Sequence, residues 1–165
     1  MTKRFLGILV ISLLLVGCAG GNPLATPYKP ASGGFFSSGG YSEKQIAPNR
    51  YYVTFRGNGY TGCTTVQNRA MLRAAEFTLE VGKDLFAIIQ ETDESKIEEG
   101  GYGGASEKCA NKLEIKVFNF EEFVDGTNLT KDQYRERSQK RIDEEAILNY
   151  FIAEDTVNYF DEYRN

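Results

Sequence analysis

The sequence predicts an α+β domain that begins as a βαβ unit. We expect a small mixed sheet of about three to four strands, one long helix after the first strand and a C-terminal helix. Residues 50–56 alternate apolar and polar side chains, as a strand with one buried face does. Residues 64–82 repeat apolar side chains every three or four positions, which is typical of an amphipathic helix. Residues 85–90 form a continuous apolar run, which suits a strand buried on both faces.

The ends of the long helix are predicted from its flanking residues. A glycine-rich turn precedes Thr64 and Thr65, and a Thr three residues before Gln67 can form a capping box, so we expect the helix to start there. Gly82 follows the last apolar repeat and is expected to end the helix. A right-handed crossover would leave the first two strands parallel.

The rest of the domain is predicted in three parts. Residues 91–112 are acidic and then glycine-rich, which indicates a long exposed loop. Residues 113–117 alternate again and predict a third strand with one face in water. A basic segment at 131–141, which could form a short helix, precedes residues 143–163, whose apolar stripe predicts a terminal helix.

The N-terminus has the order of a bacterial lipoprotein signal. Lys3 and Arg4 precede an almost unbroken apolar stretch of twelve residues at 5–16, shorter than the roughly 20 residues that a spanning helix needs. Leu15-Val16-Gly17-Cys18 then resembles a lipobox, which implies a diacylglycerol on Cys18 and cleavage before it. Residues 1–17 are therefore expected to be a signal peptide. The alternatives are a plain secretory signal or a buried apolar helix that contains a cysteine.

Residues 18–48 are expected to be a lipidated cysteine followed by a flexible tether. Their Gly, Pro and Ser content predicts a chain that buries no core, so the single globular domain is expected at 49–165. Phe35, Phe36 and Tyr41 interrupt this run and could dock a partner or pack on the domain. By resemblance to known sorting signals, the lack of Asp directly after Cys18 implies the outer membrane, facing the periplasm.

Charge and composition exclude several classes of function. A net charge of -4 argues against nucleic acid as a partner. The chain has no histidine, so catalytic triads and zinc sites that need histidine are excluded, and we expect no catalytic residue, cofactor or metal. The carboxylates of residues 91–99 could bind calcium or form a glycosidase-like pair, although such runs are usually solvated.

Residues 57–62, Gly57-Asn58-Gly59-Tyr60-Thr61-Gly62, match the G-x-G-x-x-G pattern of dinucleotide-binding loops. Because the helix cap falls after the third glycine and only one βαβ unit is expected, a plain glycine-rich turn is the preferred interpretation.

Cys63 and Cys109 are candidates for a disulfide, because they flank the first and third strands and those ends meet if the strands are antiparallel neighbours. Free thiols or a redox pair are the alternatives. Arg73 and Glu76 lie one turn apart on the helix, so an intrahelical ion pair is expected.

Three short motifs lie in the middle of the chain: Tyr52 to Thr61, then Leu72-Arg73-Ala74-Ala75-Glu76, then Gly82 and Phe86. They follow a Y-x-V-x-F-x-G-N, R-A-A-E and G-x-x-x-F pattern. This pattern resembles that of a family of small proteobacterial lipoproteins. The family has no established function, so the resemblance implies an envelope location and emphasises Gly57, Asn58, Gly59, Arg73 and Glu76 as structural or binding elements.

The leading hypothesis is a non-enzymatic envelope lipoprotein. Its domain would bind another envelope protein, or a cell-wall or lipid component, through the loop end of its sheet or its aromatic-rich terminal helix. The alternatives are a carboxylate-dependent hydrolase of envelope glycans, which needs two inward-facing carboxylates in a cleft, and a carrier of small apolar ligands, which needs an apolar pocket between helices and sheet.

Overall fold

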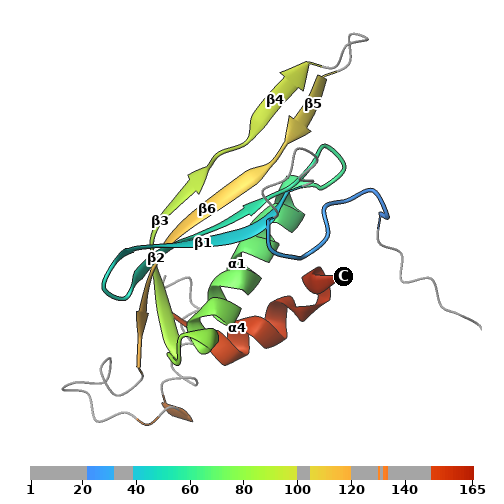
Figure 1. Ribbon diagram of the computed structural model, residues 1–165. Helices are drawn as coiled ribbons and strands as arrows, with labels where there is room; N and C mark the ends of the chain where they lie inside the picture. The colour runs from blue at the N-terminus through green and yellow to red at the C-terminus, as the bar shows by residue number, and fades with distance from the viewer. Residues whose placement is uncertain (1–21, 32–38, 100–104, 120–129, 131, 134–149) are drawn as a thin grey trace, which may run out of the picture.

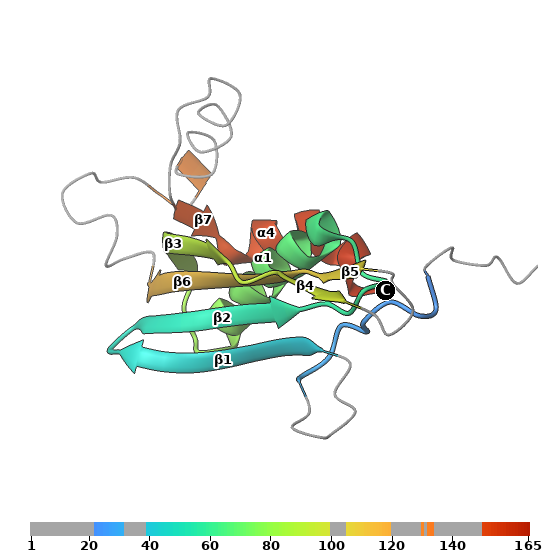
Figure 2. The same ribbon diagram turned by 90° about the horizontal axis from the view of Figure 1, so that it is seen from above.

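A computed structural model describes residues 22–31, 39–99, 105–119, 130, 132–133 and 150–165. A five-stranded sheet has the order β1-β2-β6-β3-β7, and a two-stranded sheet pairs β4 with β5. The strands are β1 (Gly40–Ala47), β2 (Arg50–Arg56), β3 (Leu85–Asp93), β4 (Lys96–Glu99), β5 (Ala105–Lys108), β6 (Ala110–Phe118) and β7 (Tyr150–Ile152). The helices are α1 (Cys63–Glu80), α4 (Ala153–Phe160) and the 3₁₀ helix η1 (Asp161–Arg164). Figure 2 shows the five strands side by side.

The predicted fold class is wrong, because the number and the pairing of the strands differ from those expected. The structure has seven strands in two antiparallel sheets, not a small mixed sheet of three to four strands. The strands β2 and β3 run in the same direction but do not pair, because β6 lies between them and is antiparallel to both. Local periodicity identified β6 as a strand, but it carries no information about which strands β6 would separate.

The core lies between the sheet and the two helices, which cover the same face of the sheet (Figure 1). Val53 and Phe55 of β2 lie beside Leu113 and Ile115 of the neighbouring strand β6, and all four side chains are fully or almost fully buried. From α1 the layer receives mainly small residues, which let the helix pack close to the sheet: Val66, Ala70, Ala74 and Ala75.

The two ends of α1 differ in how well they were predicted. The helix begins at Cys63, its N-cap is Gly62, and no side chain caps it, so the predicted capping box of Thr64 and Gln67 is wrong. The predicted end is confirmed: the helix stops at Glu80, and Gly82 adopts a positive φ of 73° that glycine tolerates without strain.

The predicted loop at 91–112 is wrong. β3 continues to Asp93, and β4 and β5 form a hairpin arm that extends beyond the main sheet (Figure 1). The arm has exposed residues on both of its faces, so no apolar alternation marked it as a strand pair. The third predicted strand, 113–117, is confirmed as part of β6.

The predicted boundary at residue 49 is also wrong, because much of the expected tether is folded. β1 pairs with β2 along its length, and the described residues 22–31 pack on the domain. Ala31 and Lys29 exchange backbone hydrogen bonds with Tyr41 at 2.7 and 2.9 Å. Tyr41 packs against the core, while Phe35 and Phe36 lie outside the described residues.

The C-terminal helix is shorter than predicted. Tyr150–Ile152 form β7 on the edge of the sheet, and α4 begins only at Ala153. Residues 134–149, the signal peptide at 1–17 and Cys18 lie outside the described residues, as does most of the basic segment 131–141. Within the described part of the chain, no helix has both the length and the apolar character needed to cross a bilayer.

Candidate functional site

One side of α1 carries two buried arginines, Arg69 and Arg73, which lie one helical turn apart. Arg73 donates from Nη1 and Nη2 to the two carboxylate oxygens of Glu80 at 2.6 and 2.7 Å, and from Nε to Glu43 of β1. Its guanidinium also lies 4.4 Å from the ring centroid of Tyr41. These carboxylates raise the pKa of Arg73 and outweigh the opposing effect of its burial, so Arg73 stays charged.

The predicted pair of Arg73 and Glu76 is confirmed, but at 3.5 Å it is longer than the Arg73–Glu80 and Glu76–Arg164 ion pairs at 2.6 and 2.7 Å. Glu76 binds two other groups more closely. Tyr28 donates its hydroxyl to Oε2 at 2.5 Å, and Arg164 of η1 donates to Oε1 at 2.7 Å. Burial, together with the Glu76 carboxylate, raises the pKa of Tyr28 well above its usual range, so the hydroxyl remains a donor.

Arg69 ties the two ends of the described chain to α1. Its Nη1 donates to the carbonyl of Thr26, and its Nε and Nη2 donate to the backbone oxygens of Tyr163 and Asn165 at 2.7 and 2.9 Å. Burial lowers the pKa of Arg69 from its ordinary value. A guanidinium is not deprotonated in proteins, so Arg69 stays charged. We call Thr26, Tyr28, Arg69, Arg73 and Glu76 the terminal clasp.

The turn Gly57-Asn58-Gly59 holds the same N-terminal segment. The Asn58 side chain donates to the carbonyl of Leu24 at 2.8 Å, and the Asn58 backbone N–H donates to Thr26 Oγ1 at 2.7 Å. A Cβ on Gly57 would lie 2.8 Å from Val66 Cγ2, so this glycine is required by packing against α1. The turn residues therefore bind protein groups, and nothing in their geometry favours the dinucleotide interpretation.

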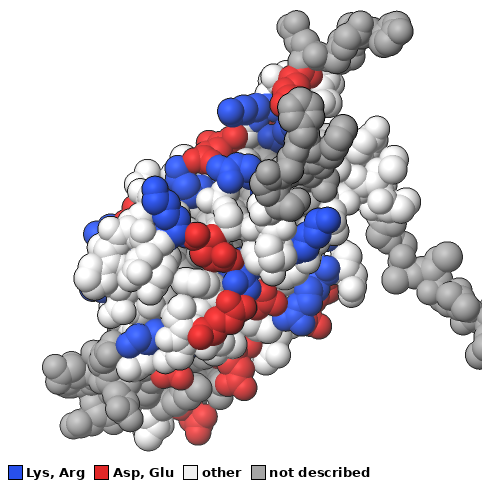
Figure 3. All heavy atoms as spheres, viewed as in Figure 1, with Lys and Arg blue, Asp and Glu red and all other residues white. Residues whose placement is uncertain are grey.

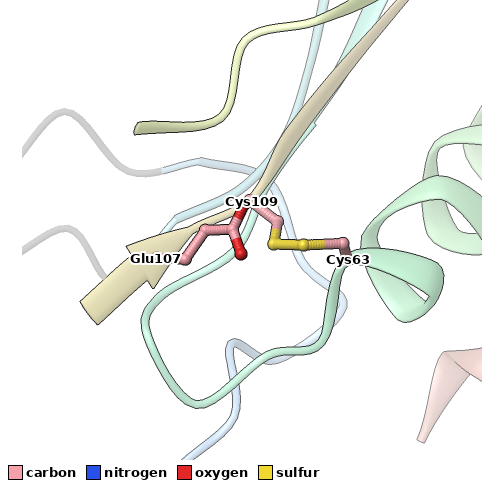
Figure 4. Close-up of side chains that lie close together, drawn as sticks. All are labelled: Cys63, Glu107 and Cys109. Carbon is pink, nitrogen blue, oxygen red and sulfur yellow. A yellow bond between two sulfur atoms is a disulfide. The ribbon is translucent and has the colours of Figure 1, made fainter. Parts of the chain in front are cut away.

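The predicted disulfide between Cys63 and Cys109 is present (Figure 4). It joins the start of α1 to the residue between β5 and β6, with 5.1 Å between the Cα atoms. The strand ends meet as expected, because β2 and β6 are antiparallel neighbours. The Glu107 carboxylate and the two sulfurs lie within 4.8 Å of one another, but bonded sulfurs supply no thiolate ligands for a metal.

A polar groove of 330 Å³ lies at the loop end of the sheet, beside the hairpin arm. Its charged lining consists of Arg56, Glu94, Lys96, Glu98 and Lys108. Glu94 accepts from Arg56 at 3.0 Å and from Lys112, and Glu98 accepts from Lys108 at 2.5 Å. The hydrogen bond from Lys112 is the main reason that the pKa of Glu94 lies below its ordinary value.

This groove does not favour the hydrolase hypothesis. A glycosidase acid needs a raised pKa, whereas that of Glu94 is lowered. The other predicted carboxylates point to separate partners: Glu91 accepts from Asn111 at 2.7 Å, and Asp93 accepts from the Ser95 N–H at 2.8 Å. On the face seen in Figure 3, basic and acidic side chains are interspersed.

The space between α1 and the sheet is filled by side chains. Val53, Phe55, Leu113 and Ile115 from the sheet and Val66 from α1 are at most 1 % exposed. Such close packing in the described core leaves no room for a sizeable apolar ligand, so the carrier hypothesis is not favoured.

Comparison with known proteins returned no match among protein families, curated proteins or solved structures. The resemblance to small proteobacterial lipoproteins therefore stays a prediction. Sequence reasoning missed Arg69, Tyr28 and Thr26. A basic residue one turn before Arg73 on the core side of an amphipathic helix was the available signal for Arg69. No local pattern marked Thr26 or Tyr28.

Proposed function

We propose that this chain is a membrane-anchored lipoprotein of the bacterial envelope whose domain faces the periplasm and binds an envelope protein or a cell-wall component. The Cys63–Cys109 disulfide is the observation that carries the proposal, because such bonds persist in oxidising compartments and are rare in the cytosol. The lipobox at Leu15 to Cys18 supports an exported, lipidated chain.

The polar groove is the surface that we assign to the partner. It lies at the loop end of the sheet, and the exposed arm forms part of its wall through Lys96, Glu98 and Lys108. Its lining mixes three cations, Arg56, Lys96 and Lys108, with two carboxylates, which suits a polar or zwitterionic surface better than an apolar one.

Mass spectrometry of the mature protein tests the anchor. We expect an N-terminal Cys18 that carries a diacylglycerol and an added acyl chain, together with an oxidised Cys63–Cys109 pair. The Cys18→Ser form should be secreted without lipid. A chain that keeps residues 1–17, remains in the cytosol and has reduced cysteines would overturn the proposal.

Capture from gently solubilised envelopes tests the groove. We expect one component to co-purify in near-equal amount and to be lost from the Lys96→Glu variant. Lys44→Glu is the matched control, because Lys44 is an exposed lysine of β1 outside the groove. Equal loss from both variants, or from neither, would remove the assignment to the groove.

A further inference from the structure

The described N-terminal segment is fixed to the domain at Thr26. Thr26 is fully buried. Its N–H donates to Thr61 Oγ1 at 2.8 Å, its hydroxyl accepts from the Asn58 N–H at 2.7 Å, and its carbonyl accepts from Arg69. A segment held by both the glycine-rich turn and α1 cannot swing freely about the domain.

The predicted lipid attachment site is close to this fixed point along the chain. Cys18 and Leu24 are six residues apart, so even a fully extended chain places them no more than roughly 20 Å from each other. A flexible tether that extended to residue 48 would have let the domain take any orientation. Because Thr26 is fixed to the domain, a lipid on Cys18 would keep the domain surface around Leu24 near the bilayer.

Two exposed apolar side chains lie at this end of the molecule. Leu24 is 58 % exposed and Tyr60 is 61 % exposed. The Asn58 carboxamide joins them, because it donates to the carbonyl of Leu24 at 2.8 Å and accepts from the backbone N–H of Tyr60 at 3.1 Å. Tyrosine is enriched at membrane interfaces, where its ring is apolar and its hydroxyl stays hydrated. We call Leu24 and Tyr60 the anchor-side patch.

We infer that the anchor-side patch rests on the phospholipid surface that holds the lipid of Cys18. The domain then has one orientation, with the Cys63 end of α1 toward the bilayer and the Glu80 end away from it. The patch is exposed, adjoins the fixed segment and lies within the reach of the anchor. This inference rests on the proposed lipid anchor and adds the surface by which the domain meets the membrane.

The chain contains no tryptophan, so a single introduced tryptophan reports on one position. We would prepare the lipidated protein as Tyr60→Trp and as Leu79→Trp, and reconstitute each into phosphatidylethanolamine–phosphatidylglycerol vesicles with brominated acyl chains. Leu79 is 44 % exposed and lies near the other end of α1, about 24 Å along the helix from Cys63. We expect at least twofold stronger quenching in the Tyr60→Trp variant.

The outcomes separate the two proposals. If both lipidated variants bind the vesicles and are quenched equally, or if Leu79→Trp is quenched more, the orientation is wrong and the lipid anchor stands. If mass spectrometry finds no lipid on Cys18, the anchor itself fails. Circular dichroism of each variant checks that the fold is kept, and the Cys18→Ser form of Tyr60→Trp gives the quenching that occurs without an anchor.

Discussion

The terminal clasp and the hairpin arm both contain ion pairs, but they use them in different environments. In the clasp, the side chain of Arg73 is 9 % exposed and that of Glu76 is 17 % exposed. In the arm, the side chains of Lys108 and Glu98 are 44 % and 55 % exposed. Buried charges are costly to leave unpaired, whereas exposed pairs contribute about 0–1 kcal/mol.

This difference indicates separate roles for the two regions. The clasp fixes residues far apart in sequence: Arg69 joins Thr26 to Tyr163 and Asn165 through α1. The charges of the arm can exchange partners at little cost, so they are suited to meeting another molecule. We therefore expect substitutions in the clasp to change stability and those in the arm to change binding.

Removal of the Cys63–Cys109 disulfide should cause the largest loss of stability. The bond joins α1, which carries the arginines of the clasp, to the residue that follows the arm. The bond closes a loop with a sequence separation of 46. The loss of this restraint on the unfolded chain predicts a destabilisation of about 4 kcal/mol for the Cys63→Ala, Cys109→Ala double variant. Urea unfolding of the variant and of the oxidised parent measures it. A loss below about 1 kcal/mol would contradict the prediction.

Arg69→Met tests the clasp directly. The variant leaves the buried carbonyl of Thr26 and two further backbone oxygens without their donor, so we expect a loss of about 3 kcal/mol. Arg56→Met is the matched control in the groove. The side chain of Arg56 is 52 % exposed, and its loss should cost less than about 1 kcal/mol.

Hydrogen exchange shows which part of the chain is loosened in the Arg69→Met variant. Amides of residues 22–31 should exchange faster in Arg69→Met and stay protected in Arg56→Met. If the two arginine variants were equally destabilised, the distinction between the two regions would be wrong.

Gly57→Ala tests the turn that supports the clasp. Its new Cβ would lie 2.8 Å from Val66 Cγ2 and 2.9 Å from Thr61 Cβ, so we expect a loss of about 2 kcal/mol. Gly62→Ser is the control, since a Cβ there meets nothing within 4 Å and the hydroxyl can cap α1. Thermal unfolding should show a lower Tm for the first variant and an equal or slightly higher Tm for the second.

The smallest change in stability is expected when the Glu94 carboxylate of the groove is protonated. The pKa of Glu94 lies below its ordinary value of 4.5, chiefly because Lys112 donates to it. A lowered folded-state pKa stabilises the fold above about pH 4.5, and this stabilisation is lost as the pH falls through the folded-state pKa.

Glu94→Gln should therefore be less stable than the parent at neutral pH, by less than about 1 kcal/mol because the groove is solvated. The difference should shrink as the pH falls through the folded-state pKa of Glu94, because below it the parent also lacks the charge. Urea midpoints measured from neutral pH downward test this, and a difference that grew on acidification would reverse the assigned sign.

The predictions that succeeded depend on neighbours in the sequence. The strand at 50–56, the end of α1 near Gly82 and the strand at 113–117 follow from apolar periodicity and glycine conformation. The disulfide followed from two strand ends and the assumption that those strands are neighbours, which the register of β2 and β6 confirms.

The failures share a different cause. β1 was taken for tether and the arm for loop because neither has an apolar face that a periodicity test detects. β1 is held by hydrogen bonds to β2 and by the contact of Glu43 with Arg73, and both depend on partners elsewhere in the chain.

The positions of the main strands and of the long helix follow from the amino-acid sequence alone, because the period of apolar side chains is set by local backbone geometry. The order of the strands and the existence of the clasp depend on tertiary packing. The Arg73–Glu43 and Arg69–Asn165 contacts join residues 30 and 96 positions apart. Such contacts form only after packing brings the segments together, so no short stretch of sequence encodes them.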